Sequence, residues 1–322
     1  GKWVAALSSF ADLQVQQTEV DQQMASSAMT SCAGRDTWTS AIALSCELQM
    51  LSVETDTAVV NAAMSAVSGA GGWTLALSIL EDVTTRQSID VISINAALSA
   101  CERSGQWQPA MSLLEGCLQS VPDIISYGTA VSACEKEGRW EEAVYLLSRL
   151  PEVRIAGDLS FYNAVISASE KGSRWQMALR LLPMISVLRL EADVVSYSSA
   201  ISACQKCEEW RVALLLLSEM KMIHVKVDTI ACNAAISASR SSSWLEALGL
   251  LNTMRFCAMR STITTFGSII SCFESIGRWQ LALQMLRISE TQGLRLQDIT
   301  CNAAIGACEK GVRRVSQHES KK

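Results

Sequence analysis

The segment VSACEKEGRWEEA, residues 131–143, contains a tryptophan motif that recurs along the whole chain. Taken alone, its adjacent Cys134, Glu135 and Lys136 look like a reactive cluster. The chain has nine tryptophans, however, and each lies 33 to 35 residues after the previous one, at positions 3, 38, 73, 107, 140, 175, 210, 244 and 279. The text before them recurs too, as in SACERSGQW and SACQKCEEW. Because a catalytic site occurs once in a chain, this motif indicates a structural repeat.

The repeat contains two helices. In the repeat 194–228, apolar residues follow helical spacing from Val194 to Cys204, and again from Trp210 to Met220. Neither helix can bury its apolar face alone, so the repeats must stack. We predict an all-α fold, a single α-solenoid superhelix over residues 1–322 with about eight complete helix–turn–helix repeats and the first helices on its concave side. We call a position within the repeat a slot and set the repeat frame so that Trp is slot 17. The complete repeats are then 22–56, 57–90, 91–123, 124–158, 159–193, 194–228, 229–262 and 263–297, with partial repeats at 1–21 and 298–322.

Particular residues mark the ends of the two helices. Glycines at 105, 138 and 277 stand just before the tryptophan, where the first helix must end and the chain must turn. We interpret the tryptophan at the start of the second helix as a core wedge, with stacking on nucleic-acid bases as the alternative. Pro183 lies late in a predicted second helix and is expected to shorten or kink it.

Composition narrows the class of protein. The chain of 322 residues is 49% hydrophobic, but apolar blocks such as VALLLL at 212–217 fall far short of the roughly 18 residues that cross a bilayer. We therefore expect no membrane partner. The net charge of −5 argues against a non-specific nucleic-acid binder, which needs a strong basic field.

The cysteines fit buried thiols better than disulfides or metal ligands. Five of the twelve share one phase of the repeat, where other repeats carry Val67, Ser169, Ser239 and Phe273; they are Cys32, Cys101, Cys134, Cys204 and Cys308. A slot that accepts Cys, Val, Ser or Phe is a buried packing position, where free Cys behaves as a small hydrophobe. Reduced thiols suggest an intracellular compartment. Cys204 and Cys207 form one CxxC without a second pair, a weak metal signal, and we expect neither a metal nor a cofactor.

Two further slots carry polar residues at a fixed phase. The final slot is Asp in six consecutive repeats and then changes to Thr262 and Gln297; the six are Asp56, Asp90, Asp123, Asp158, Asp193 and Asp228. Slot five holds a small polar residue or Gly, namely Ser26, Asn61, Asn95, Gly128, Asn163, Ser198, Asn233 and Gly267. At these residues the chain resembles the pentatricopeptide repeat family, in arrays of its P type, and segments 158–171 and 193–206 look like the first helix of that repeat.

The resemblance implies sequence-specific binding of single-stranded RNA, with the slot-five and final residues reading one base per repeat. By resemblance, Asn with Asp selects U and Ser with Asp selects G, which gives 5′-GUUNUG-3′ over the repeats ending at Asp56 to Asp228. Gly128 with Asp158 leaves one base undetermined, and Asn233/Thr262 and Gly267/Gln297 match no assigned pair. The alternative is structural: Asp before a helix can act as an N-cap, and Asn can bond the local backbone.

Cations also recur once per repeat, near the end of the first helix. They are Arg103, Lys136, Lys171, Lys206, Arg240 and Lys310. They could form a track for RNA phosphates. They could equally be cations favoured at a helix C-terminus by the helix dipole, and the sequence does not decide between the two.

Three classes of function remain. The first is an RNA-binding protein of organellar RNA metabolism (stability, processing, splicing or translation), with other RNA-processing proteins as further partners and the chloroplast favoured over the mitochondrion; all of this is implied by the resemblance. The second is a protein-binding scaffold. The third, a nuclease, is disfavoured because metal-dependent catalysis needs clustered carboxylates, and we expect no enzyme. The sequence opens at GKW, inside a repeat and without Met, so we expect a fragment.

Overall fold

The computed structural model describes residues 57–70, 72–86, 90–116, 122–239, 244–256, 259–294 and 298–319. These residues form fifteen α-helices and contain no strand. The chain divides into two compact units, residues 1–157 and residues 158–322. Some predictions concern residues outside this described part, namely Trp3, Trp38, Ser26, Cys32, Asp56, Arg240 and Gln297.

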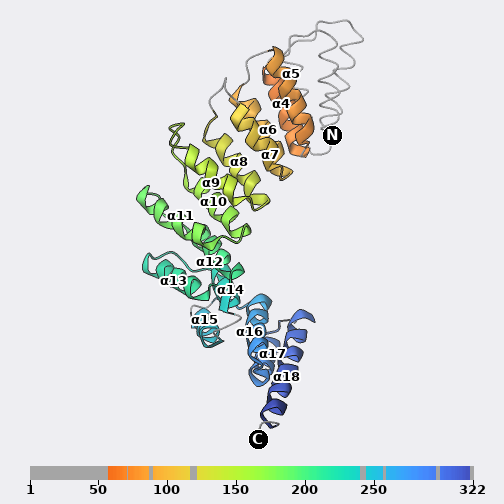
Figure 1. The fold of residues 1–322 in the computed structure, drawn as a ribbon, viewed down its shortest axis with the longest axis vertical. Coiled ribbons are helices and arrows are strands. Elements are labelled where there is room, and N and C mark those ends of the chain that lie inside the picture. Colours follow the sequence, from red (N-terminus) through yellow and green to blue (C-terminus); the bar gives the residue numbers. More distant parts are fainter. Residues whose placement is uncertain are drawn as a thin grey trace. The chain divides into compact units, whose positions relative to one another are not determined.

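The first and second helices of the repeats alternate along the chain within each unit (Figure 1). Unit 1 contains α4 (Thr57–Ala70), α5 (Trp73–Arg86), α6 (Val91–Arg103), α7 (Trp107–Gly116), α8 (Ile124–Lys136) and α9 (Trp140–Arg149). Unit 2 contains α10 (Leu159–Lys171), α11 (Trp175–Val187), α12 (Val194–Lys206), α13 (Trp210–Met222), α14 (Thr229–Ala238), α15 (Trp244–Phe256), α16 (Ile263–Ile276), α17 (Trp279–Thr291) and α18 (Asp298–Glu319). Each described second helix begins at its tryptophan, which confirms the predicted phase.

Most first helices begin with a side-chain cap. The carboxylates of Asp123, Asp158, Asp193 and Asp228 each accept a hydrogen bond from the backbone N–H three residues on, at 2.8 to 2.9 Å. Such a bond satisfies a donor that has no partner within the helix. Thr262 caps α16 in the same way. Asp90 precedes α6 without a side-chain capping bond.

The turn inside each repeat requires a left-handed residue. Gly105, Gly138 and Gly277 have φ of 66° to 70°, as their position before the tryptophan predicts. The same slot holds Ser173 and Glu208, with φ of 56° and 57°. The chain therefore adopts the turn geometry even where its sequence lacks the glycine that favours it.

Small residues form the centre of each repeat. Three residues after every described tryptophan lies a fully buried alanine: Ala76, Ala110, Ala143, Ala178, Ala213, Ala247 and Ala282. The cysteine slot is buried as predicted at Val67, Cys101, Cys134, Ser169, Cys204, Ser239 and Phe273, whereas Cys308 is only half-buried. Burial raises the pKa of Cys134 and of Cys204 to about 12, so neither is a thiolate at neutral pH. First helices of successive repeats pack on one another, α4 on α6 on α8 in unit 1 and α10 on α12 on α14 on α16 on α18 in unit 2.

Two local expectations need correction. Pro183 does not shorten its helix, since α11 has 13 residues, the same length as α13. Leu181, Leu182 and Ile185 around it are buried, and this packing holds the turn despite the missing N–H. The tryptophans pack at the margin of the core rather than inside it, as Trp73 and Trp244 do against their core clusters. Each described one is half-buried except Trp279, which is 38% exposed. As the first residue of its helix, the ring lies at the end of the helix pair, and the alanine three residues on takes the central position.

Replacing Trp175 by Ala should therefore cost about 1–2 kcal/mol of unfolding free energy, less than the about 3–5 kcal/mol of a fully buried ring. Urea denaturation followed by circular dichroism measures this difference. A cost above 3 kcal/mol would show that the ring is buried after all.

Candidate nucleic-acid interface

The structure brings slot five of one repeat against the final residue of the same repeat. In the repeat 91–123, Asn95 Nδ2 donates to Asp123 Oδ1 at 3.3 Å. In the repeat 159–193, Asn163 Nδ2 donates to Asp193 Oδ1 at 3.2 Å. Asn233 makes the corresponding bond to the Thr262 hydroxyl at 3.3 Å. The two slots identified in the sequence are thus about thirty residues apart in the chain and in hydrogen-bond contact in the fold.

A third residue completes each of these contacts. Ser126, at slot three of the next repeat, donates from its hydroxyl to Asn95 Oδ1 at 2.6 Å. Ser196 donates to Asn163 Oδ1 at 2.5 Å, and Thr265 to Asn233 Oδ1 at 2.6 Å. Because the amide oxygen accepts from a hydroxyl, the amide nitrogen faces the repeat end. In Asn163 this nitrogen bonds Asp193 through one hydrogen, which leaves the second for a ligand, whereas Asn233 Nδ2 also donates to the Thr264 hydroxyl at 3.2 Å.

The remaining predicted pairs differ. Asn61 accepts from Ser93 at 2.7 Å, but Asp90 is exposed and its side chain makes no capping hydrogen bond to α6. The Ser198 hydroxyl donates to the carbonyl of Val194 at 2.6 Å within its own helix, and Asp228 serves as a cap. Gly128 belongs to unit 1 and Asp158 to unit 2. Gly267 offers no side chain, and a Cβ there would lie 3.1 Å from Thr300 Cγ2.

Hydrogen bonding favours the ionised form of two repeat-end carboxylates, Asp123 and Asp193. Partial burial tends to raise the pKa of Asp193, but bonds from the Ser196 backbone, the Ser196 side chain and Asn163 outweigh it and lower the pKa below the usual range. The pKa of Asp123 is lowered by the corresponding bonds from Ser126 and Asn95, against the same effect of burial. Both groups are therefore acceptors only at neutral pH.

These depressed pKa values predict a pH dependence of stability. A carboxylate with a lowered folded pKa contributes stability above its unfolded pKa, near 4, and loses it as pH falls through the folded value. We expect a variant with Asp123→Asn and Asp193→Asn to be less stable than the parent at pH 7, and the difference to shrink as pH falls below about 4. Denaturant titrations at a series of pH values measure it. A difference that stays constant down to pH 2 would contradict the lowered pKa values.

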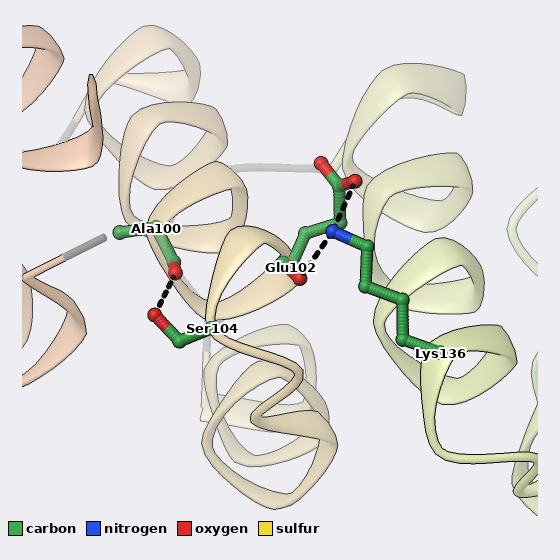
Figure 2. A network of polar contacts seen from close by, with 4 residues as sticks. All are labelled: Ala100, Glu102, Ser104 and Lys136. Carbon is green, nitrogen blue, oxygen red and sulfur yellow. Dashed lines mark hydrogen bonds and ion pairs between the residues drawn. The ribbon is translucent and has the colours of Figure 1, made fainter. Parts of the chain in front are cut away.

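The recurring cations are paired between neighbouring first helices. Figure 2 shows Lys136, on α8, reaching Glu102 on α6, where its Nζ lies 3.1 Å from Glu102 Oε1 and 2.7 Å from the Glu102 carbonyl. Lys206 contacts Glu170 in the same two ways, at 3.4 and 3.1 Å, and Lys310 lies 3.1 Å from Glu274 Oε1. Arg103 donates to the Gly69 carbonyl at 3.3 Å, and Lys171 also takes part in an interaction. Arg103, Lys136, Lys206 and Lys310 thus bind the carboxyl-terminal turn of the previous first helix, an arrangement that neither sequence interpretation had included.

Comparison with known proteins identifies the repeat type of two segments of the chain. The model of the PPR repeat matches residues 125–155 and 195–225. The crystal structure of the pentatricopeptide repeat protein PPR10 from maize matches with a TM-score of 0.61 and 20% identity, over 99% of this chain and 51% of that one. The chain therefore contains pentatricopeptide repeats. Its fold is the α-solenoid of that family, as the sequence predicted.

A second solved structure is PPR10 in complex with an 18-nt psaJ RNA element, which matches with a TM-score of 0.55 and 20% identity, again over 99% of this chain and 51% of that one. The chain therefore spans about half the length of the solved structures that it matches. No curated protein sequence matches it.

The sequence analysis missed an exposed apolar residue that occupies slot two in several repeats. These residues lie two positions after the repeat-end Asp, and are Ile92 (60% exposed), Ile125 (61%), Val195 (53%) and Ile230 (62%). Each directly precedes slot three. The signal was an aliphatic residue at a phase that the helical pattern assigns to solvent.

Two other kinds of site find no support in the described part of the chain. No group of three or more His, Cys, Asp or Glu side chains there could hold a metal ion. Among the described helices, none is both long and apolar enough to span a bilayer.

Proposed function

We propose that the chain binds single-stranded RNA in a sequence-specific manner, reading one base with each slot-five and final residue. The observation that carries this proposal is the contact of Asn95 with Asp123 and of Asn163 with Asp193. A capping role alone requires the Asp but not the amide beside it. The complex of PPR10 with an RNA element supports RNA as the ligand class.

The paired groups match the edge of uracil. Hydrogen bonds to Asp193 from Ser196 and Asn163 all end on Oδ1, so Oδ2 retains acceptor capacity. The uracil imino N–H can donate to this carboxylate, and the second Asn163 amide hydrogen can donate to a uracil carbonyl. Cytosine and adenine present an unprotonated nitrogen where uracil has its imino N–H. An ionised Asp therefore disfavours them.

The exposed slot-two residues supply a surface for the faces of the bases. Val195 follows Asp193 by two residues and directly precedes Ser196, which contacts Asn163. A base that bonds this pair can cover the Val195 side chain and remove apolar surface from water. The same arrangement holds for Ile125 beside Asp123 and Ser126. This contact adds affinity without selecting a base.

The cations remain candidate phosphate contacts, in competition with their carboxylate partners. Glu102→Gln with Glu170→Gln frees Lys136 and Lys206 from their ion pairs. If both lysines bind phosphate, the variant should bind RNA more tightly and with a salt dependence steeper by about one to two counterions. Fluorescence anisotropy over a range of salt concentrations measures both quantities. The matched control is Glu191→Gln with Glu290→Gln, which removes two exposed carboxylates elsewhere. An equal gain in the control, or no gain in either, would show that the lysines only join repeats.

We assign no catalytic step to this chain, and its action would follow from binding, by shielding RNA from nucleases or remodelling it. This fits the roles in RNA stability, processing, splicing or translation that the family has in organelles, alongside other RNA-processing proteins. The chloroplast is the compartment we favour.

Selection from a random RNA pool tests the proposed function. The expected result is enrichment of a motif related to 5′-GUUNUG-3′, with the fourth base free. A protein-binding scaffold would enrich no motif, and that outcome would contradict the proposal.

A further inference from the structure

We propose that the residue at slot three determines base specificity through its hydroxyl group. The hydroxyl fixes the side-chain amide of the slot-five Asn in the preceding repeat, so that the amide N–H, rather than the amide oxygen, faces the base. This inference rests on the proposed RNA function and adds a third position to each reading site. The residues concerned are Ser93, Ser126, Ser196 and Thr265.

The pattern holds at every described slot-five Asn that is followed by another repeat. Asn61, Asn95, Asn163 and Asn233 each accept a hydrogen bond on Oδ1 from a slot-three hydroxyl, at 2.5 to 2.7 Å. Where slot five is Ser198 instead, slot three of the next repeat is Ala231, and the Ser198 hydroxyl bonds its own helix. A hydroxyl therefore accompanies the amide in both units.

The direction of the hydroxyl proton follows from the groups around the slot-three oxygen. Ser196 Oγ accepts from the Asp193 backbone N–H at 3.3 Å, while the Ser196 backbone N–H donates to Asp193 Oδ1 at 2.9 Å. Ser126 makes the same pair of bonds with Asp123. Asp193 Oδ1, at 2.9 Å, competes for the one hydroxyl proton, but the amide oxygen lies closer, at 2.5 Å, and cannot itself donate, so the hydroxyl donates to the Asn oxygen.

The consequence is an amide held at both ends. Asn163 accepts from Ser196 through Oδ1 and donates to Asp193 through Nδ2. Without the hydroxyl, one bond to the carboxylate remains, and the amide can pivot about it. A pivoting amide can offer either its oxygen or its nitrogen toward a base, so discrimination between uracil and cytosine weakens.

The test measures base preference at one nucleotide rather than stability. Ser196→Ala should lower the ratio of affinities for RNAs with U and with C opposite Asn163 about 2–10-fold, the worth of one hydrogen bond. Ser196→Thr keeps the hydroxyl, as Thr265 does naturally, and should retain the parental ratio. Because Ser196→Ala also removes a capping bond, thermal unfolding of each variant is recorded in parallel. A capping role alone would move stability and leave the ratio unchanged, and that result would overturn the inference.

A second experiment adds the slot-three hydroxyl where it is absent and so removes no capping bond. Ser198→Asn places an amide opposite Ala231, and Ser198→Asn with Ala231→Ser adds the hydroxyl. We expect both to move the preference at that base from G toward U, and the double variant to discriminate about 2–10-fold better than the single one. Ala231→Ser alone is the matched control and should leave the preference for G in place. Equal discrimination by the single and double variants would overturn the inference. If the parent itself binds no RNA, the proposed function fails, which is a different result from an unchanged ratio.

Discussion

Phe273→Ala is expected to lower the free energy of unfolding of unit 2 by about 3–5 kcal/mol. Phe273 is fully buried in the slot where other repeats carry Val, Cys or Ser, and its ring lies 6.3 Å from that of Trp244. Buried residues of α14, α15, α16, α17 and α18 form one cluster around it. Truncation removes apolar contacts and leaves a cavity that these helices cannot close without moving.

Urea denaturation measures this loss, and hydrogen exchange shows how far it spreads through the cluster. Phe256→Ala is the matched control, because its side chain is 93% exposed and its removal should change stability by no more than about 0.5 kcal/mol. Similar costs at the two positions would contradict the assignment of Phe273 to the core.

Asp90→Asn is expected to move the base preference of the repeat 57–90 from U toward C, by about 1–3 kcal/mol. The substitution replaces an obligate acceptor with a group that can donate to the unprotonated nitrogen of cytosine. Asp90 is the cleanest position for this change, since it makes no side-chain capping bond to α6. Loss of a cap therefore does not accompany the change.

Binding of four RNAs that differ only at the second base of the core measures the effect. Asp158→Asn is the control: slot five of its repeat is Gly128, and the amide oxygen of Asn can still accept the capping bond from Phe161. We expect it to leave stability nearly unchanged and to produce no U-to-C change. If Asp90→Asn binds all four RNAs as the parent does, the base-reading role of Asp90 is wrong.

Much of the fold was predictable because its signals are local. The start of α13 at Trp210, the N-cap of α12 at Asp193 and the left-handed turn at Gly277 each depend on residues within one or two helical turns. The slot-five and final residues were also identified, since strict periodicity exposes any residue type that keeps its phase. Their contact could not be read from phase alone, because phase gives the position of a residue along the helix and not its partner.

The sequence by itself determined the period, the two helices of each repeat, the caps and the buried slot that holds Cys134 and Cys204. Only the tertiary structure decided the partners of Lys136 and Lys206, the half-exposed position of the tryptophans and the bond from Ser196 to Asn163. The physical reason is distance along the chain. Caps and helical faces arise from residues three to four positions apart, whereas these contacts join residues more than thirty positions apart and exist only once one repeat has stacked on the next.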